Sequence, residues 1–598
     1  MVIWLTIIMF FTCADNCISF LSGRLPSGDI CLQKGPSDET GRSALQAYSA
    51  PLMRAFLICA LSLALVACGE HEDSAASGID FPAEGPVAGD TGKGSFTFGA
   101  ATASAQIEES VPELDWYLWT KPAPDGLGMG EEFVGDAVRG YELAIDDVML
   151  ASDTNLDAYR FNVNWSRLEP ARDNISATAL AHYDGLIDAL VAAEIKPMIT
   201  LHHFSNPLWV DDPRRDSDAP CTPSDTDLCG WNDEAGSVLI AEELAELGAL
   251  MATEYGDRVD EWVTINEPIN YLLSAYGTAS YPPGRGGLFD LLDPEAFEAL
   301  IDTVENMAAA QAALYDAIKA NDTVDADGDG VAAHVGFVLS VIDWVPSRDG
   351  ALSDDPADIE ATENLRYVYH QLFTDAFVYG QWDRNLDRVI DESEQRPDWK
   401  GKIDFLGPQY YFRAGVTRTA STNIPIVGGF PCFAGLPLTD ACIEVEDPTK
   451  CIPTMQYEYA EEGLSKILIE FAELWPDLPM TVTEAGIATE VGRRRSENVV
   501  RTLEQIWKAR EAGVDVRGYY HWSLMDNFEW DLGFAPKFGL YKVDVDSGTY
   551  ARTATEGATT LATIAGQRAL STEMREEFGG TGPMTPESLD APAMNEIC

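Results

Sequence analysis

Two stretches decide the fold: Thr264-Ile265-Asn266-Glu267-Pro268 and Thr481-Val482-Thr483-Glu484-Ala485-Gly486. Each places a glutamate at the end of an apolar, β-branched run, and the Pro or Gly that follows ends the predicted strand. A single glutamate is usually a solvated surface charge, but a charge at the end of a buried strand is costly without a purpose. Two carboxyl groups at the carboxyl ends of separate buried strands are what cleavage of a glycosidic bond requires.

Outward from these stretches, eight apolar runs of strand length alternate with segments of helical periodicity. The predicted strands are 96–101, 158–165, 196–203, 261–266, 334–344, 404–411, 479–484 and 516–523. The predicted helices include 180–193, 239–254, 294–320, 360–380, 457–474 and 497–512. Eight strand–helix repeats predict an α/β fold, a single (β/α)8 TIM barrel, with long loops (206–234 and 412–456) at its carboxyl-terminal face.

The amino-terminal region is interpreted as targeting sequence. Met53-Arg54 precedes an apolar run that ends in Leu65-Val66-Ala67-Cys68, the pattern of a lipoprotein-type signal peptide over 53–68. We therefore expect export and a lipid anchor to the membrane at Cys68, facing the periplasm or the cell exterior; a plain signal peptide is the alternative. Residues 1–52 form a doubtful upstream segment, 69–94 a flexible tether, 95–570 the barrel domain and 571–598 a tail.

Charge and cysteine content restrict the partners and the compartment. The 598 residues carry a net charge of −59, which disfavours nucleic acid and anionic membrane surfaces as partners. Such charge also suggests a saline habitat, where salt screens the self-repulsion. Six cysteines follow residue 68, and an even number in an exported protein predicts disulfides. Cys221–Cys229 is the most local pair, and one bond is expected within Cys432, Cys442 and Cys451, with the connectivity left open.

Four motifs in order give a specific resemblance. They are Asn266-Glu267-Pro268, Thr483-Glu484-Ala485-Gly486, the stretch 98–108 (FGAATASAQIE) and the stretch 522–530 (WSLMDNFEW). Over residues 95–565 the chain resembles glycoside hydrolase family 1, the β-glucosidases and their relatives. It departs from the family pattern at Gln409, Phe204 and Ala485, which leaves the detailed sugar preference open.

The resemblance implies a retaining mechanism through a covalent glycosyl-enzyme intermediate. Glu484 would be the nucleophile and Glu267 the acid/base, with carboxyl groups about 5 Å apart. Arg160 would contact the nucleophile and help to keep it charged. The sugar contacts carried over by the resemblance are Gln106, His203, Asn266, Tyr411, Trp522, Glu529 and Trp530. No cofactor is implied for the chemistry.

The expected activity is hydrolysis of terminal β-D-glucosyl residues from β-glucosides or short oligosaccharides. A β-galactosidase, β-fucosidase or mixed-specificity enzyme and a transglycosylase are alternatives on the same site. A non-catalytic carbohydrate-binding relative is a further alternative, although such relatives typically lose one of the two glutamates. The sequence leaves the aglycone, the linkage and the oligomeric state undetermined.

One acidic motif lies outside these assignments. Asp325, Asp327 and Asp329 alternate along Asp325-Ala326-Asp327-Gly328-Asp329-Gly330, the pattern that begins a calcium loop. No glutamate stands at the twelfth position, so an acidic turn is the alternative to a structural Ca²⁺ site.

Overall fold

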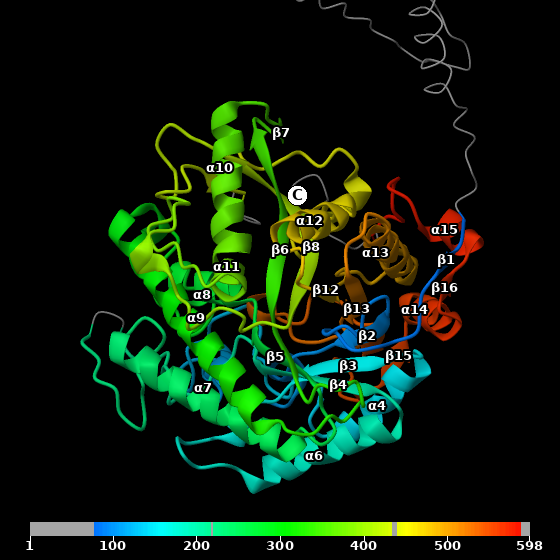
Figure 1. Ribbon diagram of the computed structural model, residues 1–598, viewed down its shortest axis with the longest axis horizontal. Helices are drawn as coiled ribbons and strands as arrows, with labels where there is room; N and C mark the ends of the chain where they lie inside the picture. The colour runs from blue at the N-terminus through cyan, green and yellow to red at the C-terminus, as the bar shows by residue number, and fades with distance from the viewer. Residues whose placement is uncertain (1–76, 217–218, 433–438, 588–598) are drawn as a thin grey trace, which may run out of the picture. The chain divides into compact units, whose positions relative to one another are not determined.

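The computed structural model describes residues 77–216, 219–432 and 439–587. Eight parallel strands close into a barrel, because β13 pairs with β2 and β6 pairs with β8. The strands are β2 (Thr97–Ala101), β3 (Ala158–Asn162), β4 (Lys196–His202), β5 (Glu261–Asn266), β6 (His334–Arg348), β8 (Phe405–Thr417), β12 (Met480–Ala485) and β13 (Val516–Trp522). The predicted (β/α)8 barrel is confirmed, and β5 has the predicted bounds (Figure 1).

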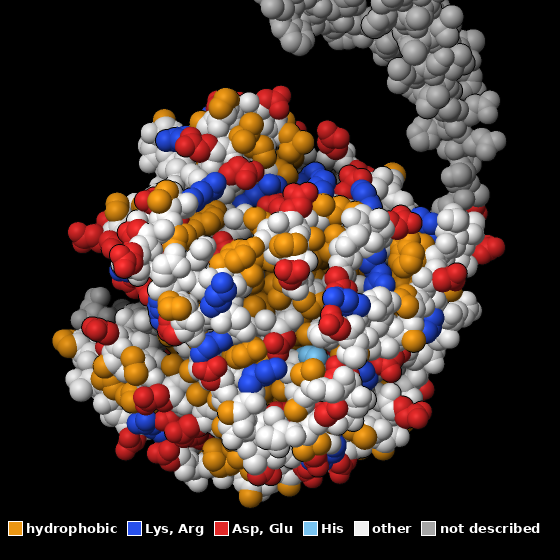
Figure 2. Space-filling view, viewed as in Figure 1, with side chains coloured by type: hydrophobic (Ala, Val, Ile, Leu, Met, Phe, Trp, Pro, Cys, Tyr) orange, Lys and Arg blue, Asp and Glu red, His pale blue; other side chains and the backbone are white. Residues whose placement is uncertain are grey.

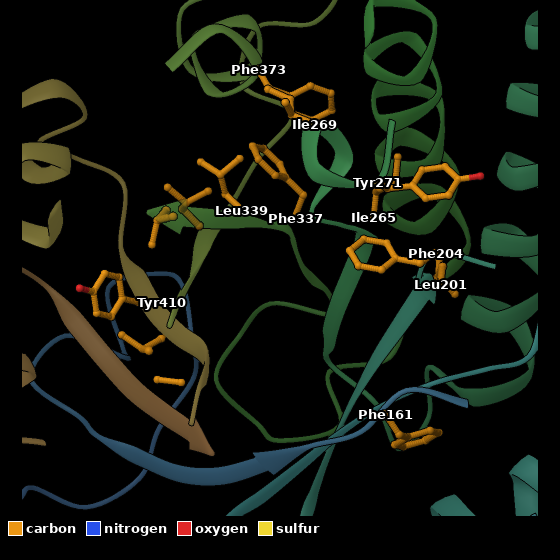
Figure 3. Packing of buried hydrophobic residues seen from close by; sticks show 14 of the residues in the cluster. Phe161, Leu201, Phe204, Ile265, Ile269, Tyr271, Phe337, Leu339, Phe373 and Tyr410 are labelled. Carbon is orange, nitrogen blue, oxygen red and sulfur yellow. The ribbon is translucent and has the colours of Figure 1, made fainter. Parts of the chain in front are cut away.

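Helices flank the strands in the order that the periodicity predicted. The longer ones are α4 (Ala144–Asp153), α6 (Ala177–Ala192), α7 (Glu234–Tyr255), α9 (Pro294–Asn321), α10 (Pro356–Arg366), α12 (Glu462–Leu474), α13 (Gly492–Glu511) and α14 (Glu556–Gln567). They cover an apolar layer on the outside of the strands. Phe337 of β6 and Phe373 of α11 (Leu372–Val378) lie in this layer with ring centroids 5.1 Å apart (Figure 3).

Several elements differ in length from the sequence expectation. Strands β6 and β8 were predicted to end at residues 344 and 411, but they stay paired as far as Pro346 and Val416. Each strand supplies the other's hydrogen bonds, so the pair continues as a ribbon past the ends of the other strands. The single helix predicted over 360–380 is divided, because a π-helical turn, η3 (Tyr367–Gln371), separates α10 from α11.

The predicted tether is wrong for its described part, residues 77–94. Strand β1 (Ile79–Asp80) pairs with β16 (Ala569–Leu570), and Phe81 lies 4.8 Å from Phe96, centroid to centroid. Val87 and Ala88 are buried with apolar residues of β3, β4, β5, β6, β8 and β13. A few apolar residues in a polar segment are therefore enough to attach it to the barrel. The predicted signal peptide and Cys68 lie outside the described residues.

The predicted tail is also ordered where the structure describes it. Helix α15 (Thr572–Phe578) is followed by a segment whose carbonyl groups accept hydrogen bonds from α13. Arg501 donates to Gly582 O at 2.8 Å, and Arg494 donates to Thr585 O at 3.0 Å. Met584 is buried in the apolar cluster that contains Trp522. The barrel domain therefore reaches beyond residue 570.

Within the described ranges, two pairs of cysteines in the long loops at the carboxyl-terminal face form disulfides. Cys221–Cys229 joins two points between β4 and α7, and Cys432–Cys442 joins two points between β8 and β12. The first pairing and a bond within the second cysteine group are confirmed. Both bonds shorten loops beside the carboxyl ends of the strands.

The described surface carries many acidic side chains. In Figure 2 these are spread over the viewed face, and hydrophobic side chains gather near its middle. Within the described ranges, no helix has the length and apolar character needed to cross a membrane.

Candidate active site

A cavity of about 180 Å³ lies at the carboxyl ends of the barrel strands. Glu267 enters it directly after β5, and Glu484 enters it from β12. Both are nearly inaccessible, with 6% and 4% of their surface exposed. The two glutamates singled out by sequence therefore line one cavity, although 217 positions separate them (484 − 267).

Arg160 of β3 holds the Glu484 side of the cavity. Its Nη1 donates to Glu484 Oε1 at 2.5 Å, and its Nε donates to Thr200 Oγ1 at 2.9 Å. The hydroxyl of Tyr411 donates to the other carboxylate oxygen, Glu484 Oε2, at 2.7 Å. Both oxygens of Glu484 thus accept hydrogen bonds, one of them from a fully buried cation, and such contacts favour the ionised form.

The environments of the two carboxyl groups differ. Burial, together with the nearby charge of Glu484, raises the pKa of Glu267 to about 8. Burial also raises the pKa of Glu484, but the Arg160 cation and the hydrogen bond from Tyr411 oppose that rise. Burial and the charge of Glu484 therefore favour a proton on Glu267, whereas the contacts with Arg160 and Tyr411 favour the ionised form of Glu484.

Asn266 has a fixed orientation between these groups. Its Oδ1 accepts from Arg160 Nη2 at 2.6 Å and from Gln409 Nε2 at 3.0 Å. Because a guanidinium can only donate, the amide oxygen must face Arg160. The residue lines the cavity, and its Nδ2 is the group left for other contacts. Gln409, a departure from the family pattern, is therefore part of the arrangement that orients Asn266.

Aromatic and polar side chains surround the two carboxyl groups. The predicted residues that line the cavity are His203, Asn266, Tyr411, Trp522, Glu529 and Trp530. Gln106 lies behind them and donates from Nε2 to Phe528 O at 2.9 Å and to Glu529 Oε2 at 3.4 Å. Within the described ranges, Gln106 Oε1 and His203 Nδ1 have no hydrogen-bond partner. Burial, with the charges of Asp531 and Glu484, raises the pKa of Glu529 to about 8.

Three residues beside Glu267 were missed by the sequence analysis. Asn270 donates from Nδ2 to Glu267 Oε2 at 2.7 Å, and Tyr369 donates to Asn270 Oδ1 at 3.3 Å. Ser340 also hydrogen-bonds to Glu267. The spacing of Asn270, three residues after Glu267 at the start of α8 (Pro268–Leu272), was a usable signal. Ser340 and Tyr369 come from β6 and η3, and no local pattern links them to Glu267.

The acidic loop differs from the expected calcium ligands. Asp325 and Asp327 lie together with Asp260, their carboxylate oxygens within 4.8 Å of one another. Asp329 instead accepts from His334 Nε2 at 2.9 Å and from Thr91 Oγ1 at 3.0 Å. Asp325 accepts from the backbone amide of Gly328, as in an acidic turn. Asp329 does not share a site with the other two, and calcium binding stays a prediction.

Known proteins match this chain over most of its length. The model of glycosyl hydrolase family 1 matches residues 90–569. A β-galactosidase of Pyrococcus woesei is 28% identical over 505 residues, covering 75% of this chain and 92% of that protein. β-Glucosidase 28 of Arabidopsis thaliana is also 28% identical, covering 76% of this chain and 77% of that protein.

Solved structures share the fold. A β-glycosidase from Pyrococcus horikoshii has a TM-score of 0.64 at 26% identity and covers 84% of this chain and all of that one. A rice β-glucosidase, solved in a covalent complex with glucose, has a TM-score of 0.65 at 23% identity and covers 78% of this chain and 97% of that one. A family model that spans the barrel agrees with the paired, buried carboxyl groups at its carboxyl-terminal face. The chain belongs to glycosyl hydrolase family 1 and is a retaining β-glycosidase.

Proposed function

We propose that the substrate is a β-D-glucoside, and that Glu484 is the nucleophile and Glu267 the acid/base. One observation carries the assignment of roles: the two carboxyl groups share a cavity but have different partners. Glu484 accepts from Arg160 and Tyr411, whereas the carboxyl of Glu267 has a pKa raised to about 8. An ionised nucleophile and a protonated acid are the states that the first step needs.

In that step an oxygen of Glu484 bonds to the anomeric carbon while the bond from that carbon to the glycosidic oxygen breaks. The leaving oxygen takes the proton of Glu267. In the second step Glu267, now a carboxylate, takes a proton from water as the water oxygen attacks the anomeric carbon. The bond to Glu484 breaks, and Glu484 returns as a carboxylate facing Arg160. Apart from water, side chains of this chain supply every reacting group in the two steps. Family 1 hydrolysis needs no cofactor.

The polar group around the sugar would select the glycone. Among the described residues, Gln106 and His203 each have a buried polar atom without a partner; His203 and Glu529 line the cavity, and Gln106 lies behind it. A site that hydrogen-bonds particular hydroxyls rejects sugars that leave those groups unpaired. A glucoside is proposed because the Arabidopsis relative and the rice structure are β-glucosidases. A β-galactoside is the second candidate, since the Pyrococcus woesei relative is a β-galactosidase.

The test is hydrolysis of nitrophenyl β-glucoside, β-galactoside, β-fucoside, β-mannoside and β-xyloside by the wild type and by Glu484→Gln and Glu267→Gln. The highest kcat/KM is expected on the glucoside, and Glu484→Gln should abolish turnover of all five. Glu267→Gln should lower kcat, and azide should restore turnover: nitrophenol is released in the first step, and azide then attacks the anomeric carbon of the glycosyl-enzyme, so that the sugar leaves as a glycosyl azide. Wild-type rates in Glu484→Gln would overturn the assignment of the nucleophile.

We also propose that the chain is exported and anchored through a lipid on Cys68. The support is sequence alone: the apolar run after Met53-Arg54 and its Leu65-Val66-Ala67-Cys68 ending. Mass spectrometry of the mature amino terminus tests this. A diacylated Cys68 is expected, and an unmodified amino-terminal residue would contradict it.

A further inference from the structure

The loop that follows β4 carries His203 into the catalytic cavity through a strained turn. Phe204, the next residue, has a φ of +57°, in the left-handed region that residues with a β-carbon rarely adopt. Glycine takes this conformation freely, but a bulky side chain does not. Such a residue keeps its conformation only where the surrounding groups over-determine it. The groups that hold Phe204 therefore also hold His203.

Trp116 holds the turn at its backbone carbonyl. This residue belongs to the short helix α3 (Asp115–Thr120), 88 positions earlier in the chain, and is fully buried. Its indole Nε1 donates to Phe204 O at 2.8 Å. The ring of Phe204 is stacked on that of Tyr271, with centroids 5.8 Å apart (Figure 3). A hydrogen bond thus fixes the carbonyl of the strained residue, and a ring contact fixes its side chain.

Asp115 holds the end of the same turn through Asn206. Its Oδ2 accepts from the backbone amide of Asn206 at 2.9 Å and from Asn206 Nδ2 at 3.3 Å. The backbone amide of Asp115 in turn donates to Asn206 O at 3.1 Å. Asn206 Oδ1 lies 3.1 Å from His202 Nε2, so the residue before His203 is tied to the same pair. Asp115, Asn206 and His202 are each at most 3% exposed, and burial strengthens these bonds.

Helix α3 lies behind the sugar site. Neither Asp115 nor Trp116 lines the catalytic cavity, but His203 and Phe204, which they hold, both do. Within the described ranges His203 Nδ1 has no hydrogen-bond partner. Trp116 also packs against Trp530, another lining residue, with ring centroids 4.9 Å apart. The two α3 residues can therefore act on a bound sugar through their neighbours, without touching it.

We propose that Trp116 and Asp115 are positioning residues of the glycosidase, and that they hold the left-handed turn at Phe204 that directs His203 toward the sugar. A side chain that is already fixed loses little conformational freedom when the substrate binds. Without the two contacts the turn relaxes toward an unstrained backbone, and His203 leaves its place beside the sugar. The inference goes beyond the roles of the two glutamates and holds for whichever sugar the enzyme prefers.

The test removes one hydrogen bond and keeps the ring. Trp116→Phe retains an aromatic ring against Trp530 and loses the donor to Phe204 O. It should lower kcat/KM on the best nitrophenyl β-glycoside about tenfold, the equivalent of about 1.4 kcal/mol. The pH dependence of kcat/KM should stay the same, because Glu267 and its hydrogen bonds are untouched. Wild-type kcat/KM in Trp116→Phe would overturn the proposal.

The matched control is Trp209→Phe. Trp209 is also buried and also donates from its indole to a backbone carbonyl, Glu169 O at 3.0 Å, but it does not line the catalytic cavity. Its replacement should leave kcat/KM within about twofold of the wild type, since the bond that it loses is outside the turn. Equal losses in the two variants would mean that any buried indole bond in this region acts through stability, and would contradict a positioning role.

A double-mutant cycle shows whether the effect passes through His203. If Trp116 acts by placing His203, the loss caused by Trp116→Phe should be largely absent once His203→Ala has removed the imidazole. In a second cycle with Tyr411→Phe, whose hydroxyl contacts Glu484, the two losses in kcat/KM should multiply instead. Losses that multiply in both cycles would overturn the proposal. Turnover by Glu484→Gln, measured in parallel, reports on the nucleophile separately.

Asp115→Asn keeps the inference testable if Trp116→Phe does not fold. The amide oxygen can accept from only some of the groups that the carboxylate serves, because the amide nitrogen is a donor. We expect kcat/KM to fall about threefold to tenfold, and only while His203 is present. Denaturant unfolding shows that each variant is folded in the assay. A folded Asp115→Asn whose loss multiplies with that of His203→Ala would contradict the proposal.

Discussion

Asn270 donates a hydrogen bond to Glu267 Oε2 at 2.7 Å, and the same residue lines a second, largely apolar cavity of about 470 Å³ between α9 and α10. A donor favours the carboxylate form, so Asn270 lowers the pKa of Glu267 while burial, the larger effect, raises it to about 8. The acid must be protonated, so activity should fall as the pH rises through that value. The basic limb of the pH profile of kcat/KM thus reports on this hydrogen bond.

Asn270→Ala should move that limb to higher pH, because the donor that stabilises the ionised form is gone. The kcat should also fall by about tenfold, the equivalent of about 1.4 kcal/mol, since one hydrogen bond that orients the acid is lost. The measurement is kcat/KM on nitrophenyl β-glucoside between pH 5 and about 10, the interval that spans this transition. Asn321→Ala, at an exposed position of α9, is the control. A limb that moved to lower pH would contradict the assignment.

Removing the buried cation should affect both stability and activity. Arg160→Met leaves Glu484 buried without its partner, which should cost about 3–5 kcal/mol in the free energy of unfolding. Activity should be lost as well, because the pKa of Glu484 then rises. The double variant Arg160→Met with Glu484→Gln should recover much of the stability and none of the activity. Denaturant unfolding of the wild type, the two single variants and the double variant measures the coupling.

The carboxyl-terminal segment should support the apolar cluster that contains Trp522. Met584 is buried in the cluster that contains Trp522, so Met584→Ala should cost about 2–5 kcal/mol in the free energy of unfolding. We expect kcat to fall too, because the indole ring of Trp522 lines the cavity and belongs to the cluster from which the Met584 side chain is removed. Met129→Ala, at a side chain that is 43% exposed, should change neither quantity. Wild-type stability in Met584→Ala would mean that the segment only rests on the surface.

The amino-terminal segment should also contribute to stability. Phe81 lies 4.8 Å from Phe96 and 5.1 Å from Phe98, so Phe81→Ala should cost about 3–5 kcal/mol in the free energy of unfolding. Asp80→Ala, at the exposed neighbour, should cost less than about 0.5 kcal/mol. Thermal unfolding of the two variants compares them directly. A flexible tether would show the same melting temperature for both.

The barrel and its two glutamates could be predicted because the signals are local. An apolar run that ends in Glu-Pro or Glu-Ala-Gly predicts a buried strand and also marks where the carboxyl end of that strand lies. The divided helix over 356–378 was not predictable in the same way, because α10, η3 and α11 continue one apolar periodicity. The extension of β6 and β8 depends on their pairing with each other, which neither segment shows alone.

The parts of the site that sequence missed are those assembled from distant segments. Ser340 of β6 hydrogen-bonds to Glu267, whereas Tyr369 of η3 donates to Asn270, which in turn contacts Glu267; the neighbours of both residues carry no motif. The second cavity, which Asn270 lines, is formed by α9, α10 and a loop, so no single stretch of sequence predicts it. Residues 69–94 were predicted to be a flexible tether because their average composition is polar. That average hides two apolar residues, Ile79 and Phe81, which are buried in the structure.

The fixed amide of Asn266 has a consequence for which sugars the enzyme refuses. Arg160 and Gln409 both use its oxygen, so Asn266 offers the cavity only hydrogen-bond donors. A hydroxyl can accept from such a group, but a protonated amine has nothing to accept with. β-Glycosides of amino sugars whose ammonium group meets Asn266 should therefore be turned away by a mismatch of donor against donor. The Arg160 cation behind the amide adds repulsion to that mismatch.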